Sequence, residues 1–301
     1  VDFRMTSIPI ARSCFTAFTF RATLSSGDCA RKPDFAIRQT TGDARATRLQ
    51  TGAISRRTEQ AKGKSMDAID LDDVTLHVRQ DGSPGGPPVV FANSLGTDLR
   101  LWDDVVARLP EGLHLVRYDK RGHGLSTAPP APYAMGALIR DAERLIEALE
   151  LRDVVFVGLS IGGMIAQGLA AKRLDLVRAV VLSNTAPKIG TREMWEERIA
   201  TVETRGLSAM SGTIMERWFS RAFRDSPAVI PWRRMVETTP AEGYAGCCAA
   251  IAGTDFYTTT AALRLPAQVI AGDADGSTPP DLVQEMAELI PGARYDLIRG
   301  A

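Results

Sequence analysis

The stretch VVFVGLSIGGMIAQGLAAK, residues 154–172, decides how this chain is expected to fold. Its β-branched first half predicts a strand over Asp153–Val157, and its second half predicts a helix over Ile161–Lys172. Between them, a Gly-x-Ser-x-Gly pattern places Ser160 at a sharp strand-to-helix turn, where small flanking glycines let the chain double back. The Ser160 hydroxyl then stands above the sheet, with the positive end of the helix beneath it. Ser160 is therefore a candidate nucleophile.

Strands and helices alternate along the rest of residues 66–301. The expected strands are Val74–Arg79, Pro88–Ala92, Leu113–Tyr118, Val177–Ser183, Ala267–Ala271 and Ala293–Ile298, and the expected helices are Leu99–Leu109, 134–150 and Asp281–Ile290. Such alternation implies right-handed crossovers and a mostly parallel sheet with helices on both faces. Together with the serine turn, it predicts the α/β-hydrolase fold.

One interval breaks this alternation. Residues 187–258 are helical in character, with several tryptophans and methionines and no convincing strand. We expect them to form a helical cap inserted over the sheet. The hydrolase core then comprises 66–186 and 259–301, which fits one catalytic domain in a chain of 301 residues.

The first 65 residues differ from the remainder in charge and composition. They carry nine Arg and three Lys against five acidic residues, and they start with Val1. No apolar face is apparent, so residues 1–65 are expected to be a disordered leader or an N-terminus mis-extended upstream of a start at Met66.

Whole-chain composition limits the function classes. Lys plus Arg equals Asp plus Glu at 36 each, which gives no overall electrostatic case for binding nucleic acid or an anionic membrane. The longest apolar runs are strand-length, far short of about 20 residues for a membrane span. Four cysteines give no disulfide framework and favour a reducing, cytoplasmic location. No metal or other cofactor is expected.

A second element lies in the segment Asn93-Ser94-Leu95-Gly96, which directly follows an expected strand. Acyl transfer needs two N–H donors where the oxyanion forms, and losing one costs about 3 kcal/mol. In this architecture one donor is the N–H after the nucleophile, here Ile161, and the other comes from the loop after the earlier strand. We choose Leu95 for the second donor. An ordinary connecting turn is the alternative.

The catalytic acid is expected in the loop after strand Ala267–Ala271. We choose Asp275 over Asp273 there, with the role of fixing the tautomer of a base histidine. An acidic turn before a proline-started helix is the alternative.

The base is expected after the acid, because the chain order in this architecture is Ser, acid, His. His123 precedes Ser160 and is given a structural role, while His77 and His114 are expected to be solvated. No histidine follows Asp275. We therefore expect the chain to be truncated just before its base.

Four segments resemble the 3-oxoadipate enol-lactonase family over residues 67–301: NSLGTDLRLWD at 93–103, DKRGHG at 119–124, GLSIGG at 158–163 and GDADGSTPP at 272–280. The resemblance implies hydrolysis of 3-oxoadipate enol-lactone in the β-ketoadipate pathway of aromatic catabolism, with Ser160 as nucleophile. Trp218 and Arg217 in the cap are then substrate-binding candidates, although Arg217 fits equally well as a surface side chain. Some relatives are fused to a carboxymuconolactone decarboxylase domain, so such a fusion is a possible partner.

Two other functions remain open. The first is a general carboxylesterase or another capped hydrolase, since the serine turn is common to all of these enzymes. The second is a ligand-binding relative that keeps the pocket without turnover. The intact Ser160 and Asp275 argue against the second.

Overall fold

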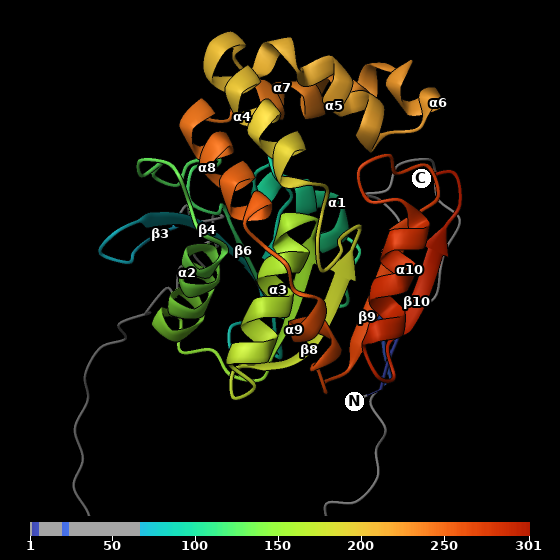
Figure 1. Cartoon of the computed structure of the whole chain (residues 1–301). Coiled ribbons are helices and arrows are strands. Elements are labelled where there is room, and N and C mark those ends of the chain that lie inside the picture. Colours follow the sequence, from blue (N-terminus) through green and yellow to red (C-terminus); the bar gives the residue numbers. More distant parts are fainter. Residues whose placement is uncertain (1, 6–19, 24–66) are drawn as a thin grey trace, which may run out of the picture.

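The computed structural model describes residues 2–5, 20–23 and 67–301. Its main sheet has eight strands in the order β10-β9-β8-β7-β5-β6-β4-β3 (Figure 1). Their bounds are β3 (Asp67–Asp70), β4 (Thr75–Gly82), β5 (Pro88–Ala92), β6 (His114–Tyr118), β7 (Val154–Leu159), β8 (Val177–Ser183), β9 (Ala267–Gly272) and β10 (Arg294–Ile298). β3 and β4 pair antiparallel, β4 pairs antiparallel with β6, and the other pairs are parallel.

The central strands are buried on both faces. Every residue of β6 and β7 is buried, and β7 accordingly reads as a continuous apolar run instead of an alternating pattern. Helices α2 (Met135–Ala148), α3 (Ile161–Lys172), α9 (Tyr257–Ala261) and α10 (Pro280–Leu289) cover the sheet. This arrangement confirms the expected fold class.

The expected helix Leu99–Leu109 is instead two short pieces, η1 (Leu99–Trp102) and α1 (Asp103–Val106). The Asp98 carboxylate accepts a hydrogen bond from Arg100 N and so caps a tight 3₁₀ turn. The prediction of a single helix was wrong because Asp98 starts the 3₁₀ turn.

Between β8 and β9 the described chain forms helices and no strand. These are α4 (Arg192–Arg205), η2 (Leu207–Ala209), α5 (Ser211–Trp218), α6 (Arg221–Arg224), η3 (Pro227–Val229), α7 (Ile230–Glu237) and α8 (Ala241–Ala252), followed by α9. Figure 1 shows α4–α8 stacked over one end of the sheet. We call residues 187–258 the cap.

The backbones of the cap and the core approach each other closely at Gly243. A Cβ built on Gly243 of α8 would lie 2.1 Å from the carbonyl oxygen of Gly122, in the loop after β6. Any side chain at Gly243 would therefore push α8 away from the core.

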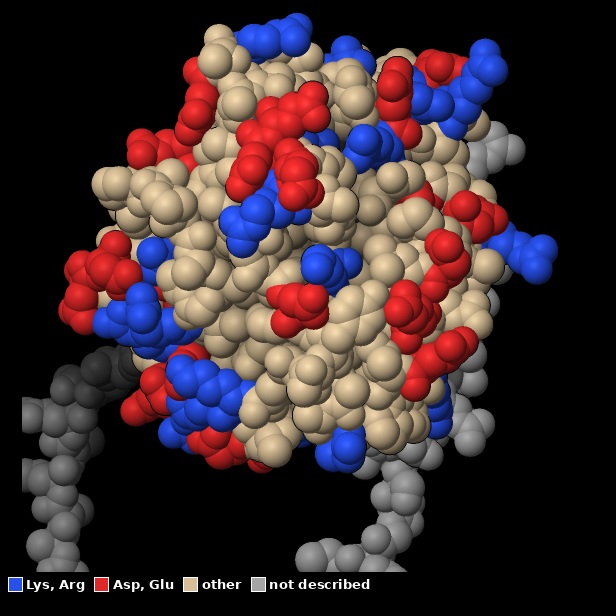
Figure 2. Space-filling view, viewed as in Figure 1, with Lys and Arg blue, Asp and Glu red and all other residues tan. Residues whose placement is uncertain are grey.

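The expected leader, 1–65, lies outside the described residues apart from strands β1 (Asp2–Met5) and β2 (Phe20–Thr23), which pair antiparallel. In the described part of the chain, no helix has both the length and the apolar character needed to cross a membrane. Figure 2 shows acidic and basic side chains interspersed on the visible face.

Candidate active site

Ser160 occupies a strained turn between β7 and α3. Its backbone has φ 56° and ψ −119°, in a region that residues with a Cβ adopt at a cost. A Cβ at Gly162 would lie 2.1 Å from the carbonyl oxygen of Ala92, so glycine is required there. Ser160 N donates to Ser183 O at 3.0 Å, and Thr185 Oγ1 donates to Ser160 O at 2.7 Å. These bonds hold the turn and keep Ser160 at the N-terminus of α3.

Asp275 lies in the loop after β9, with four donors on its carboxylate. Oδ1 accepts from Ser277 N at 2.7 Å and Thr278 N at 3.2 Å, while Oδ2 accepts from Asn184 Nδ2 at 2.7 Å and Thr278 Oγ1 at 2.8 Å. Burial raises the pKa of Asp275, and these hydrogen bonds oppose the rise. Asp273 instead accepts hydrogen bonds from the backbone of residues 300 and 301.

Ser160, Asp275 and Trp218 line one small cavity of about 30 Å³. The full lining is Ser94, Leu159, Ser160, Asn184, Trp218, Asp275, Ser277 and Thr278. The structure thus brings the expected nucleophile, acid and cap tryptophan together, although their roles stay predictions. Asn184 was not singled out from the sequence, although its position directly after β8 was a signal that could have identified it.

Arg217 does not line this cavity. Its side chain is exposed, and its contact with the site is through the backbone, where its carbonyl oxygen accepts from Gly276 N at 2.9 Å. The bond joins the end of α5 to the loop that carries Asp275.

The segment Asn93–Thr97, which we call the oxyanion loop after its expected role, is hydrogen-bonded to the segment after β6. Lys120 Nζ donates to Ser94 O at 2.6 Å, and Gly96 N donates to His123 Nε2 at 2.9 Å. Within the described part of the chain, Leu95 N and Ile161 N donate no hydrogen bond. The two N–H groups expected to hold an oxyanion are thus not used within the described chain, and neither residue is among those that line the Ser160 cavity.

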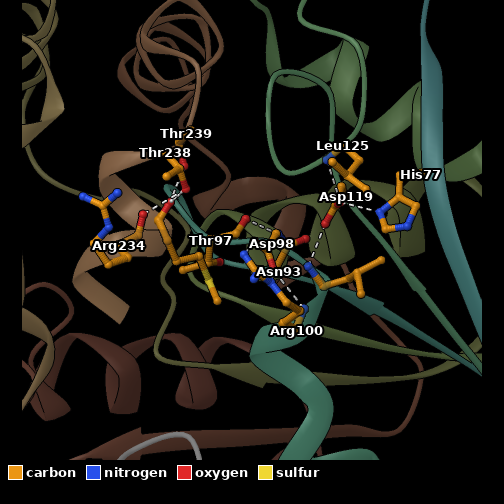
Figure 3. Close-up of polar contacts among 12 residues, drawn as sticks. His77, Asn93, Thr97, Asp98, Arg100, Asp119, Leu125, Arg234, Thr238 and Thr239 are labelled. Atoms are coloured by element: carbon orange, nitrogen blue, oxygen red, sulfur yellow. Dashed lines mark hydrogen bonds and ion pairs between the residues drawn. The ribbon is translucent and has the colours of Figure 1, made fainter. Parts of the chain in front are cut away.

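The three histidines are engaged elsewhere. His123 is fully buried, and burial lowers its pKa well below the ordinary value, so the ring is neutral and its Nε2 lone pair serves Gly96. His77 Nδ1 lies 2.7 Å from Asp119 Oδ2 (Figure 3), and His114 Nε2 lies 2.9 Å from Gln80 Oε1. The expectation that His77 and His114 are merely solvated was wrong. No histidine of the described chain lines the Ser160 cavity.

A larger cavity of about 480 Å³ lies between β4, the start of η1 and α7 and shares no lining residue with the Ser160 cavity. Its charged groups are largely paired: His77 with Asp119, and Arg100 with Asp98 (Figure 3). Among the described residues, no cluster of His, Cys, Asp and Glu is placed to hold a metal ion.

Comparison with known proteins places this geometry in a family. The chain is 35% identical over 214 residues to 3-oxoadipate enol-lactonase 2 of Acinetobacter baylyi, covering 70% of this chain and 80% of that relative. The chain belongs to the α/β-hydrolase family. A family model for the alpha/beta hydrolase fold matches residues 87–210. The resemblance to enol-lactonases expected from the sequence is thereby confirmed.

Solved structures of this α/β-hydrolase family agree. The enol-lactonase from Burkholderia xenovorans superposes with a TM-score of 0.73 at 35% identity, covering 77% of this chain and 91% of that one. A thermophilic esterase from Thermogutta terrifontis superposes with a TM-score of 0.72 at 27% identity, covering 78% and 89%. Relatives in this family are hydrolases of lactones and esters, so this chain is assigned to the hydrolases.

Proposed function

We propose that this protein hydrolyses 3-oxoadipate enol-lactone, with Ser160 as the nucleophile. The observation that carries the proposal is the convergence of Ser160, Asp275 and Trp218 on one cavity, in a chain 35% identical to a 3-oxoadipate enol-lactonase. The nucleophile comes from the turn after β7, the acid from the loop after β9, and the tryptophan from the cap.

In this proposal Ser160 Oγ attacks the ring carbonyl carbon, and the carbonyl oxygen becomes an oxyanion held by Leu95 N–H and Ile161 N–H. Collapse of the adduct breaks the ring C–O bond, and the enolate that leaves takes up a proton to become a ketone. Water then cleaves the acyl-enzyme and restores the Ser160 hydroxyl. An enolate leaves more readily than an alkoxide, so little general acid catalysis is required.

Ser160 also needs a base, since a serine hydroxyl is a weak nucleophile at its free pKa. Asp275 is proposed to orient a histidine, as the acid does in Ser-His-Asp sites. We assign that role to none of the three histidines in residues 1–301, because each is bonded away from the Ser160 cavity. In one serine protease, loss of the base costs about 10⁶ in kcat. The 301-residue chain is therefore expected to turn over weakly.

The proposed substrate carries a carboxylate, which a cation in the cap would orient. Burial raises the pKa of Tyr244, and the positive charges of Arg198 and Arg217 lower it, with Arg198 having the larger effect. Tyr244 itself lies over the oxyanion loop, with its ring 3.0 Å from where a Cβ on Gly96 would be. We therefore add Arg198 of α4 to Arg217 as a candidate for holding the carboxylate.

The test is lactone hydrolysis followed by ultraviolet absorbance, alongside 4-nitrophenyl acetate as a neutral ester. We expect the residual activity on both substrates to vanish in Ser160→Ala. Labelling of Ser160 by a fluorophosphonate probe gives a readout independent of substrate. Unchanged hydrolysis in Ser160→Ala would sink the proposal, while equal efficiency on lactone and ester would favour a general carboxylesterase.

A further inference from the structure

Lys120 is a buried cation directly beneath the oxyanion loop. Its side chain is 1% exposed, and Nζ donates at 2.6 Å to the carbonyl oxygen of Ser94. Burying an ammonium group is expensive, and here the acceptor is a neutral carbonyl instead of a carboxylate. Stability therefore does not explain why a charged side chain is buried at this position.

The Ser94 carbonyl is unusually rich in donors. Besides Lys120 Nζ, it accepts from Thr97 Oγ1 at 2.8 Å and from Thr97 N at 3.3 Å. This carbonyl and Leu95 N–H belong to one peptide unit, in which the nitrogen lone pair is delocalised toward the oxygen. Donors at the oxygen pull electron density from the nitrogen, and hydrogen bonds in such a chain strengthen one another. A cation at Ser94 O therefore makes Leu95 N–H a stronger donor.

We propose that Lys120 is a positioning residue that strengthens the oxyanion donor at Leu95 by polarising the Ser94–Leu95 peptide through its carbonyl oxygen. The inference rests on the proposed function, in which Leu95 N–H holds the oxyanion. Lys120 touches no substrate atom; it fixes the loop and sets the strength of its donor.

The surroundings make this effect titratable. Burial lowers the pKa of Lys120 to about 8, against opposing effects of Cys247 on α8, Asp119 beside it and Asp98 after the oxyanion loop. His123, on the same segment, is neutral and lowered in pKa partly by Lys120 itself. Lys120 is thus protonated below about pH 8 and loses its charge above it. As Lys120 loses its charge with rising pH, the Leu95 N–H becomes a weaker hydrogen-bond donor.

The test is nuclear magnetic resonance of the 301-residue protein, which needs no catalysis. The Ser94 carbonyl ¹³C and Leu95 amide resonances are followed as the pH is raised through about 8. We expect both to titrate together, with the Leu95 amide proton moving upfield as Lys120 deprotonates. If the Lys120 side-chain resonances titrate while the Ser94 and Leu95 resonances stay flat, the proposal is overturned.

The variant is Lys120→Met, which keeps the length of the side chain and removes its charge. Ser94 O retains both Thr97 donors, and replacing a buried charge with an apolar group does not threaten the fold. We expect the titration to disappear and Leu95 to resonate as in the high-pH wild type. Lys172→Met, at the far end of α3, is the matched control and should titrate like the wild type.

The kinetic readout is the part of 4-nitrophenyl acetate hydrolysis that Ser160→Ala removes. Lys120→Met should lower its kcat about tenfold, with KM within twofold, because a full donor is worth 10² to 10³ and this one is only weakened. If Ser160→Ala removes nothing, the proposed function fails. If it removes the activity but Lys120→Met leaves kcat intact, the Lys120 proposal alone fails.

Discussion

Replacing Ser160 with glycine should make the protein more stable while removing its proposed nucleophile. With φ at 56° and ψ at −119°, Ser160 occupies a conformation that costs a residue with a Cβ about 1–3 kcal/mol. Glycine adopts positive φ without that penalty, but it loses about 0.5–1 kcal/mol more conformational entropy on folding. The Ser160 side chain makes no capping hydrogen bond to α3 that the change would lose. We expect a net gain of about 1 kcal/mol in the free energy of unfolding.

Urea denaturation of the wild type, Ser160→Gly and Ser160→Ala gives the measurement. Ser160→Ala is the matched control, because alanine keeps the Cβ and hence the backbone strain while losing the same hydroxyl. The difference between the glycine and alanine variants isolates the backbone contribution. If Ser160→Gly unfolds at lower urea than Ser160→Ala, the turn is not strained and our account of it is wrong.

Three further outcomes are expected. Gly243→Ala should lose about 1–3 kcal/mol in thermal or urea unfolding, because its Cβ would lie 2.1 Å from Gly122 O, whereas Gly212→Ala, with open space around it, should be neutral or stabilising. The unfolding free energy of the wild type, measured relative to Lys120→Met, should fall by about 3 kcal/mol as the pH drops from 10.5 to about 8 and stay level below. Over that range Lys120 binds a proton in the unfolded state but not in the folded state, so a lower pH favours unfolding. A difference independent of pH would contradict this. Trp218→Ala should raise KM for the lactone several-fold with little loss of thermal stability, and unchanged kinetics on both substrates would remove Trp218 from the site.

Local chemistry made the serine turn predictable. The glycines, the β-branched strand and the following helix are adjacent in sequence, and β5 and β8 have the bounds that their apolar runs predict. The choice of Asp275 over Asp273 relied on loop position, and the structure brings only Asp275 to the Ser160 cavity. These predictions needed no knowledge of distant partners.

What the sequence missed depends on distant contacts. Asn184 reaches Asp275 because β8 and β9 are neighbours in the sheet, a pairing across 91 positions. Lys120 lies under Ser94 only once β5 and β6 pair. Sequence reasoning left Arg217 either in the pocket or at the surface; its side chain is exposed, and its carbonyl oxygen contacts the loop that carries Asp275.

That last contact has a consequence for how substrate range can evolve. The bond from Gly276 N to Arg217 O joins the cap to the loop carrying Asp275, and it uses only main-chain atoms. Substitutions of cap side chains therefore leave this joint intact. Substrate specificity can therefore change through side-chain substitutions in α4–α7 while the loop that carries Asp275 stays bonded to the cap.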